Sequence, residues 1–190
     1  MKKKFTLRDL ILMGLLSVVF GLLYLGAVYA GAALTTALTP SGYGILGYEP
    51  FYGIWFMAAL AATYILRRPF VGVLTEVIAS VIEVLLGNMF GPIIFISAII
   101  QGLGVELAFG LARYRKYTYG LASLAALFCT VLSFIWTGFR NHYLSLDPKL
   151  VLLIFVIRVV SALIFTGLLA PFLCEKLIKA GVLRSDDDAE

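Results

Sequence analysis

The chain has 190 residues, of which 62% are apolar and only 14% charged, and its formal net charge is +4. Its mean hydropathy is +1.00. Soluble domains average about a quarter charged residues, and a soluble chain of this size has too much surface to cover with so few charges. Composition therefore excludes a secreted disulfide scaffold, a nucleic-acid-binding protein and a disordered regulator. It predicts an integral membrane protein.

Long apolar runs with few charges predict a single all-α membrane domain over residues 1–190, crossed by six transmembrane helices. The predicted spans are residues 10–37, 51–66, 70–86, 93–112, 119–139 and 150–178. Several spans begin at or just after a proline, where the missing backbone N–H breaks no helical hydrogen bond. The expected architecture is a six-helix bundle.

Lysines and arginines are distributed unevenly between the two predicted sides of the membrane. They gather before span one, between spans two and three, between spans four and five, and after span six, whereas the opposite side carries only Arg140 and Lys149. Because cytoplasmic loops are enriched in these residues, both termini are predicted to be cytoplasmic. The acidic tail, residues 185–190, is then a solvated cytoplasmic end.

Span one also has some features of a signal peptide, with a basic start and small residues near Ala30. Its apolar stretch is longer than the 7–15 residues of a signal-peptide core, which favours a retained helix.

The motifs of common enzyme classes and metal sites are absent from the sequence. There is no P-loop, no HExxH, no GxSxG and no paired Cys/His spacing. Cys129 and Cys174 lie in apolar spans without a CxxC partner, which is typical of packing residues. His142, the only histidine, falls in an outer loop and is predicted to be a surface residue. We therefore expect no cofactor or metal, and a binding unit without an ATPase of its own.

Four charged residues stand out within the predicted spans, away from the span ends at the basic side: Glu76, Glu83, Glu106 and Arg158. A charge at the bilayer centre costs roughly 2.5–3.5 kcal/mol on insertion scales, so each one is a functional candidate. Glu76 and Arg158 lie at similar depth and are predicted to form a structural ion pair. Glu83, closer to the outer end of span three, is predicted to contact a ligand. Glu106 lies nearer the cytoplasm in span four and is predicted to be a structural group.

Aromatic and polar side chains gather at the outer ends of the spans. The candidates are Tyr52 and Trp55 in span two and Trp136 and Asn141 near the end of span five. They fit an interfacial aromatic belt. Together with Glu49 and Glu83 they equally fit a site for a flat, nitrogen-containing, neutral or cationic small molecule. The glycine-rich loop 38–49 is suited to cover such a site.

Small residues follow one face of the cytoplasmic half of span one. Gly14, Ser17 and Gly21 recur at i, i+3 and i+7 and permit close approach of another helix. Internal packing and docking of a separate membrane subunit are both compatible with this pattern.

Four stretches carry a resemblance to a known family: residues 47–69, 74–88, 100–109, and 152–169 around Arg158. In them the chain resembles the substrate-binding S components of energy-coupling-factor (ECF) vitamin transporters. The resemblance covers nearly the whole chain. It is strongest to the YkoE-type S components for thiamine or its precursor hydroxymethylpyrimidine (HMP).

The resemblance implies a six-helix S-component fold with an outward-facing vitamin site beneath the loop that joins spans one and two. It also implies a complex with a membrane coupling subunit and two cytoplasmic ATPases. Glu83 would contact the aminopyrimidine and Glu49 the thiazolium charge. The remaining implied contacts are ring stacking by Trp55, Tyr52 or Trp136 and polar contacts from Gln101 and Asn141. For docking to the coupling subunit, Gly14, Ser17 and Gly21 stand where the family usually carries alanines at four-residue spacing.

Two other functions remain open from the residues. An ion-coupled transporter would use the buried glutamates and show uptake that depends on pH or membrane potential. An intramembrane enzyme would use Glu76, Glu83 or His142 as acid or base.

Overall fold

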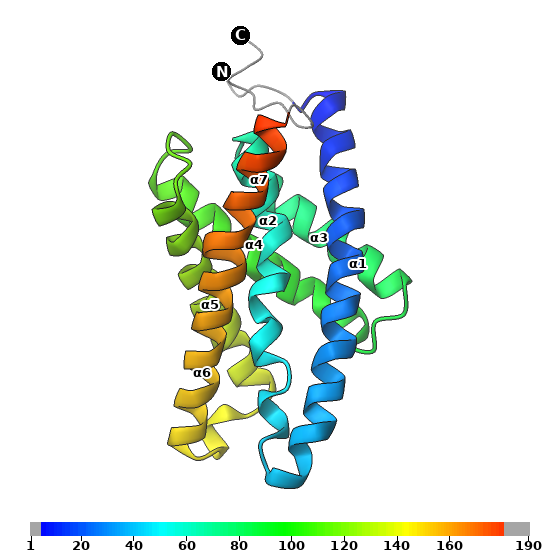
Figure 1. The fold of residues 1–190 in the computed structure, drawn as a ribbon, viewed down its shortest axis with the longest axis vertical. Coiled ribbons are helices and arrows are strands. Elements are labelled where there is room, and N and C mark those ends of the chain that lie inside the picture. Colours follow the sequence, from blue (N-terminus) through cyan, green and yellow to red (C-terminus); the bar gives the residue numbers. More distant parts are fainter. Residues whose placement is uncertain (1–4, 181–190) are drawn as a thin grey trace.

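The computed structural model describes residues 5–180, and these residues are helical, with short connections and no strand (Figure 1). The α-helices are α1 Leu7–Leu38, α2 Met57–Leu66, α3 Val71–Leu85, α4 Ile94–Leu111, α5 Tyr119–Arg140, α6 Pro148–Ala162 and α7 Ala170–Lys179. The π-helical segment η6, Leu163–Leu169, joins α6 to α7 without a break. The 3-10 segments are η1 Thr39–Ser41, η2 Gly44–Leu46, η3 Glu49–Phe56, η4 Gly91–Ile93 and η5 Tyr143–Ser145.

Five helical segments within the described residues are long and apolar enough to cross a membrane. They are Leu7–Ser41, Gly44–Leu66, Gly91–Leu111, Tyr119–Arg140 and Pro148–Lys179. The third predicted span is the exception. At 1.5 Å per residue, the 15 residues of α3 reach only about 22 Å, less than the ~30 Å of a hydrocarbon core. The helix runs obliquely across the bundle (Figure 1).

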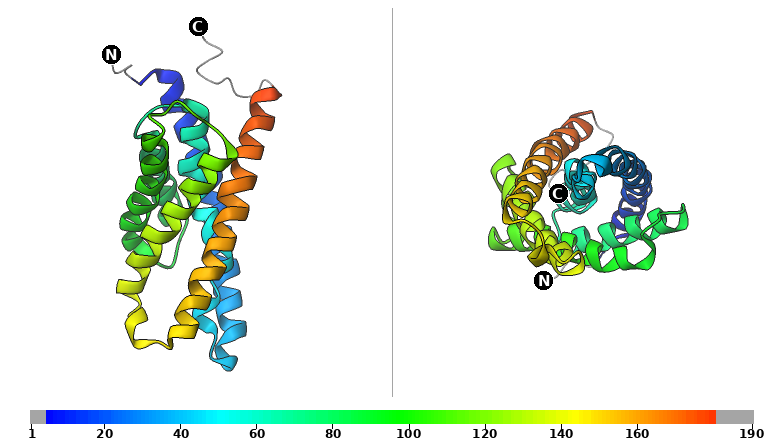
Figure 2. Two further views of the ribbon diagram at one scale, coloured as in Figure 1. Left: turned by 90° about the vertical axis from the view of Figure 1, so that its left-hand side faces the viewer. Right: turned by 90° about the horizontal axis from the view of Figure 1, so that it is seen from below.

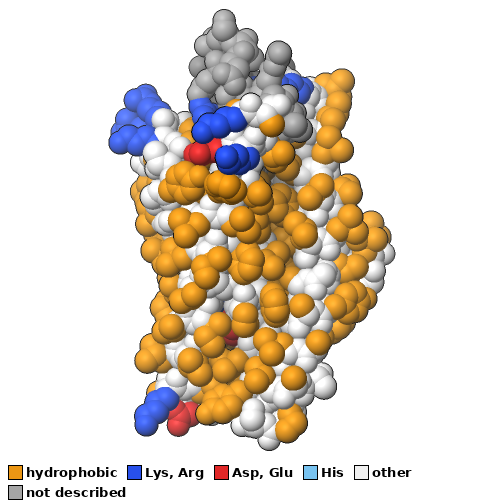
Figure 3. Space-filling view, viewed as in Figure 1, with side chains coloured by type: hydrophobic (Ala, Val, Ile, Leu, Met, Phe, Trp, Pro, Cys, Tyr) orange, Lys and Arg blue, Asp and Glu red, His pale blue; other side chains and the backbone are white. Residues whose placement is uncertain are grey.

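The outer surface of the bundle is apolar between two polar ends. Leucine, isoleucine, valine and phenylalanine side chains face outward along α1, α3, α4, α5 and the span from α6 to α7. In Figure 3 they cover the side of the molecule, and Lys and Arg side chains gather mainly at the upper end. That end holds the start of α1, the connections 67–70 and 112–118, and the end of α7. The lysines before Phe5, Arg184 and the acidic tail 185–190 lie outside the described residues, and the cytoplasmic placement of the termini stays a prediction.

The second predicted span forms the centre of the bundle. All ten residues of α2 are buried, against α1, α3, α4 and α7, and η3 continues the span at one end. The end-on view of Figure 2 shows this segment between α1 and the α6–α7 span. Gly53 in η3 permits the approach to α6, because a Cβ there would lie 2.3 Å from the main-chain oxygen of Ser161. The absence of a side chain at this one position therefore lets η3 pack closely against α6.

The small residues of α1 serve internal packing. The Ser17 hydroxyl is buried and donates to the carbonyl of Thr75 at 3.0 Å. A Cβ on Gly21 would lie 3.0 Å from the main-chain oxygen of Ala79, so this glycine lets α1 approach α3. The docking prediction is therefore wrong for Ser17 and Gly21, whose surface is already covered by α3. Gly14 has no neighbour within 4 Å of a Cβ position.

The two cysteines are both free and buried. The Cys129 thiol donates to the carbonyl of Gln101 at 3.1 Å, and the residue packs against Gly104. Cys174 belongs to the same buried apolar cluster. Both are packing residues, as the sequence predicts.

Candidate ligand-binding site

A cavity of about 480 Å³ lies within the bundle. Its walls come from α1, η2, η3, α3, α4 and the end of α5. Thr39, Gly44 and Asn141 line it from the connections at the end opposite the lysine- and arginine-rich loops, so the cavity reaches that end. Its volume falls in the range of about 300–1,000 Å³ typical of small-molecule sites.

Most of the predicted ligand residues line this one cavity. They are Glu49, Tyr52, Trp55, Glu83, Gln101 and Asn141. Trp136 is not among the lining residues: its indole Nε1 donates to the hydroxyl of Ser97 at 3.0 Å, and it is Ser97 that faces the cavity. The sequence placed Trp136 at the correct end of α5, but only the rotation of α5 against α4 decides which face it occupies.

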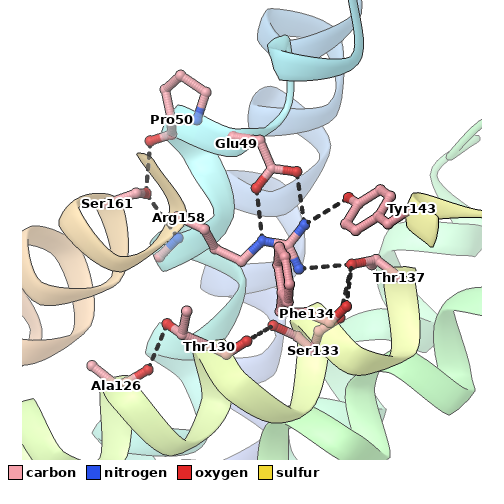
Figure 4. Close-up of polar contacts among 11 residues, drawn as sticks. Glu49, Pro50, Ala126, Thr130, Ser133, Phe134, Thr137, Tyr143, Arg158 and Ser161 are labelled. Carbon is pink, nitrogen blue, oxygen red and sulfur yellow. Dashed lines mark hydrogen bonds and ion pairs between the residues drawn. The ribbon is translucent and has the colours of Figure 1, made fainter. Parts of the chain in front are cut away.

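A buried arginine holds Glu49 at the edge of the cavity. Arg158 in α6 has no exposed surface, and its Nε and Nη2 atoms each lie 2.7 Å from a different carboxylate oxygen of Glu49. Nη1 donates to the Thr137 hydroxyl at 2.8 Å, and Nη2 also to the Tyr143 hydroxyl at 3.3 Å. Figure 4 shows these three partners around the guanidinium. The guanidinium carbon lies 3.6 Å from the ring centroid of Tyr52. We call this group the arginine cluster: Glu49, Tyr52, Thr137, Tyr143 and Arg158.

The arginine cluster corrects two predictions. The ion pair of Arg158 with Glu76 is wrong, because Glu49 takes its place through a bidentate pair. The assignment of Glu49 to a ligand cation is also not supported, since Arg158 already neutralises its charge and occupies both of its oxygens. Depth within the spans could not identify this partner of Arg158, because Glu49 lies in the predicted loop 38–49, outside the spans. The two residues are 109 residues apart in sequence.

Glu76 lies in the cavity wall instead. Its Oε2 accepts hydrogen bonds from the backbone N–H of Ala59 at 2.8 Å and the hydroxyl of Tyr24 at 3.1 Å. The Tyr24 hydroxyl in turn accepts from the N–H of Ala58 at 3.1 Å. The positive end of α2 thus stabilises one oxygen of this carboxylate. Glu76 and Tyr24 were not predicted to line the cavity. Glu76 could have been, because it lies seven residues from Glu83 and shares one helical face with it.

Glu83 has a similar arrangement farther along α3. Its Oε1 accepts from the indole N–H of Trp55 at 3.4 Å and from the Asn88 amide. Asn88 is fixed in turn because its Oδ1 accepts from the backbone N–H of Phe90 at 2.6 Å. Asn88 was not predicted as a site residue, since a single asparagine after a span is normally a helix end.

Aromatic rings form one wall of the cavity. Tyr48 lies 5.2 Å from Phe90 and 6.5 Å from Trp55, and Trp55 lies 5.6 Å from Tyr52, measured between ring centroids. Tyr52 and Trp55 face the same way because η3 has three residues per turn. Tyr48 and Phe90 are further lining residues that the sequence analysis did not select.

Glu106 serves the opposite end of α3. Its carboxylate accepts from the backbone N–H groups of Phe70 and Gly72, at 2.9 and 3.0 Å, and from the Tyr114 hydroxyl. It caps the start of α3 and does not line the cavity. The predicted structural role of Glu106 is confirmed. His142 is exposed, as predicted.

Comparisons with known proteins agree with this architecture. A family model described as ABC-type cobalt transport system, permease component, matches residues 8–132. A protein of Bacillus subtilis (strain 168) described as an HMP/thiamine permease, YkoE, is 34% identical over 182 residues, covering 96% of this chain and 89% of that protein. A crystal structure of an S component of an ECF transporter superimposes with a TM-score of 0.87 at 34% identity, covering 94% of this chain and 88% of that one.

These similarities extend over nearly the whole chain and include its helical architecture. S components are substrate-binding membrane subunits rather than enzymes. The similarity to them confirms the prediction that this chain is not an enzyme. The chain is a multi-pass bacterial membrane protein, and it belongs to the S-component family of energy-coupling-factor transporters.

Proposed function

We propose that this chain captures thiamine or HMP in the cavity and delivers it to an ATP-driven importer. The observation that carries the proposal is the composition of the cavity wall. Aromatic rings of η3 and its neighbours lie in the same cavity as two carboxylates of α3, Glu76 and Glu83. The relative described as an HMP/thiamine permease supports the choice of ligand.

The shared aminopyrimidine ring of the two ligands suits this wall. It is planar, which favours stacking on Tyr52 or Trp55, and its amino group donates hydrogen bonds to a carboxylate. Glu83 is the proposed acceptor, because Trp55 and Asn88 hold its Oε1 and orient the group. Gln101 and Asn141 line the same cavity and supply further polar contacts.

The cobalt in the family description favours a metal ligand, but the lining residues favour an organic one. Divalent transition metals are bound by several imidazole, thiolate or carboxylate ligands. Within residues 5–180, no group of three or more His, Cys, Asp or Glu side chains could hold a metal ion. An aromatic wall is instead typical of a site for a flat organic molecule.

Energy and orientation complete the proposal. The sequence contains no phosphate-binding loop, so ATP hydrolysis falls to two partner ATPases joined through a membrane coupling subunit. The lysine- and arginine-rich end, with the start of α1 and the end of α7, faces the cytoplasm by the positive-inside rule, and the cavity faces outward. Ion-coupled transport by the buried glutamates is the competing function.

Binding tests this function directly. Calorimetric titration of the detergent-purified protein with thiamine and with HMP is expected to show binding of at least one. Glu83→Gln should weaken binding at least about tenfold, which corresponds to about 1.4 kcal/mol. Glu106→Gln is the matched control, a buried glutamate outside the cavity, and should leave the affinity unchanged. Absence of binding of both molecules to the wild-type protein overturns the proposal.

Transport separates the two energy sources. The chain alone in liposomes should not accumulate thiamine under a proton or sodium gradient. Uptake that follows such a gradient without partner subunits contradicts ATP-driven coupling and supports the ion-coupled alternative.

A further inference from the structure

The three carboxylates that line the cavity differ in how many of their oxygens the protein already occupies. Both oxygens of Glu49 are held by Arg158. Glu76 receives protein hydrogen bonds only at Oε2, and Glu83 only at Oε1, among the interactions of residues 5–180. Glu76 and Glu83 therefore each keep one oxygen for a ligand, although only 1% and 2% of these residues is exposed.

No cationic side chain pairs with Glu76 among the described residues. No ion pair of Glu76 or Glu83 occurs within the described residues, and the groups on Glu76 are a hydroxyl and a backbone N–H. Among residues 5–180, Arg140 is the one cation that lines the cavity; it belongs to the end of α5, and its Nε lies 3.4 Å from the side-chain oxygen of Asn141. The charged form of a buried carboxylate is costly without a counter-ion, so a cationic ligand would stabilise that form of Glu76.

The spacing of the two carboxylates favours a ligand with two rings. Glu76 and Glu83 are separated by seven residues of α3, which is about 10 Å along the helix axis. A single-ring molecule held at Glu83 has no second ring to place beside Glu76. A molecule with an aminopyrimidine at one end and a positively charged ring at the other can contact both.

We propose that Glu76 is a specificity-determining residue that binds the positive ring of thiamine and thereby selects thiamine over neutral HMP. Tyr24 is a positioning residue: its hydroxyl bridges Glu76 Oε2 and the N-terminus of α2. This inference rests on the proposed function, since it divides that ligand pair between two subsites. In this proposal Glu76 binds the thiazolium charge, the role that the resemblance implied for Glu49.

The affinity ratio of the two ligands tests the inference. In titrations, Glu76→Gln should weaken thiamine binding at least about tenfold and change HMP binding less than about threefold. Retained HMP binding shows that the variant is folded. A neutral two-ring analogue, in which a thiophene replaces the thiazolium, separates charge from length: its affinity should be nearly the same for the wild type and Glu76→Gln.

Other variants keep the test decisive. Tyr24→Phe leaves the carboxylate in place but removes one hydrogen bond that orients it, and should lower the thiamine-to-HMP ratio about threefold or more. This variant decides the matter if Glu76→Gln does not fold. Glu106→Gln should leave the ratio unchanged.

Equal losses of thiamine and HMP in a folded Glu76→Gln protein, or no loss of either, overturn the inference and leave the proposed function standing. An unchanged ratio in Tyr24→Phe, or wild-type binding of HMP without thiamine, overturns it as well. A wild-type protein that binds neither molecule removes the proposed function itself.

Discussion

The arginine cluster and the α3 carboxylates are two ways of placing negative charge inside a membrane protein. In the arginine cluster, a guanidinium neutralises Glu49 and joins η3 to α5 and α6. Along α3, Glu76 and Glu83 receive neutral donors only and keep an oxygen uncommitted. The first arrangement satisfies its charge within the protein, and the second leaves part of it for something else.

The difference shows which intramembrane charges to assign to structure and which to a ligand. Both kinds are buried and both line the same cavity, so burial alone does not separate them. What separates them is the number of hydrogen-bonding positions that the fold already fills. Loss of a saturated pair should reduce stability, whereas loss of an open carboxylate should reduce binding.

The largest effect is expected from removing the arginine. Arg158→Met leaves the Glu49 carboxylate buried without a counter-ion, which is expected to lower the free energy of unfolding by about 3–5 kcal/mol. Thermal unfolding in detergent measures this. The double variant with Glu49→Gln should recover part of the loss, because no buried charge remains. An Arg158→Met protein as stable as the wild type would show that Glu49 is not held as described.

The next effect concerns the contact that brings η3 against α6. Gly53→Ala places a Cβ 2.3 Å from the main-chain oxygen of Ser161, and such overpacking typically costs about 1–3 kcal/mol. Since Tyr52 and Trp55 flank this position, thiamine affinity should fall as well. Gly14→Ala is the control, with no atom within 4 Å of its Cβ position, and should cost nothing. Equal stability of the two variants contradicts a tight η3–α6 contact.

Removal of the Ser161 hydroxyl at the same contact is expected to lower the free energy of unfolding by a similar or smaller amount. Ser161 accepts from the N–H of Gly53 at 3.0 Å and donates to the carbonyl of Pro50 at 2.7 Å. Ser161→Ala leaves a buried N–H without an acceptor, at a cost of about 1–3 kcal/mol in unfolding free energy. Thr36→Ala removes an exposed hydroxyl bond to Ala32 and should be near neutral by the same measurement. If both variants unfold alike, the hydroxyl does not help to hold η3.

The smallest effect distinguishes the two tryptophans. Trp136→Phe removes one hydrogen bond to Ser97 and should cost about 1 kcal/mol of stability, with thiamine affinity unchanged. Fluorescence quenching by thiamine should persist in Trp136→Phe and disappear in Trp55→Phe, because only Trp55 lines the cavity. Quenching that follows Trp136 instead would place the ligand outside the cavity.

Much of the fold was predictable because the membrane constrains it. Apolar runs must be helical when no water is present to satisfy the backbone, and the ends of the helices follow from prolines and polar connections. The features that the sequence did not predict lie where the helices depart from regular, membrane-crossing geometry. They are the 3-10 course of η3, which brings Gly53 against Ser161, and the short, oblique α3, and hydropathy encodes neither.

The candidate site was predictable by residue type but not by partnership. Charged residues in apolar spans are rare enough to identify as candidates, and Glu83 lines the cavity together with the predicted aromatic residues Tyr52 and Trp55. Trp136 does not line the cavity, because the rotation of α5 directs its indole to the Ser97 hydroxyl. Tyr24 was not selected from the sequence, because its role depends on its hydroxyl lying between Glu76 and the backbone N–H of Ala58 in α2.

The sequence by itself determined that this is a helical membrane protein, where its basic end lies and which few polar groups enter the membrane. Those properties follow from composition and from periodicity along one chain. Only the tertiary structure decided that Arg158 neutralises Glu49 and that Glu76 and Glu83 keep open oxygens. The physical reason is that a salt bridge or hydrogen bond depends on distances of a few ångströms between segments far apart in sequence, and these are set by the packing of helices.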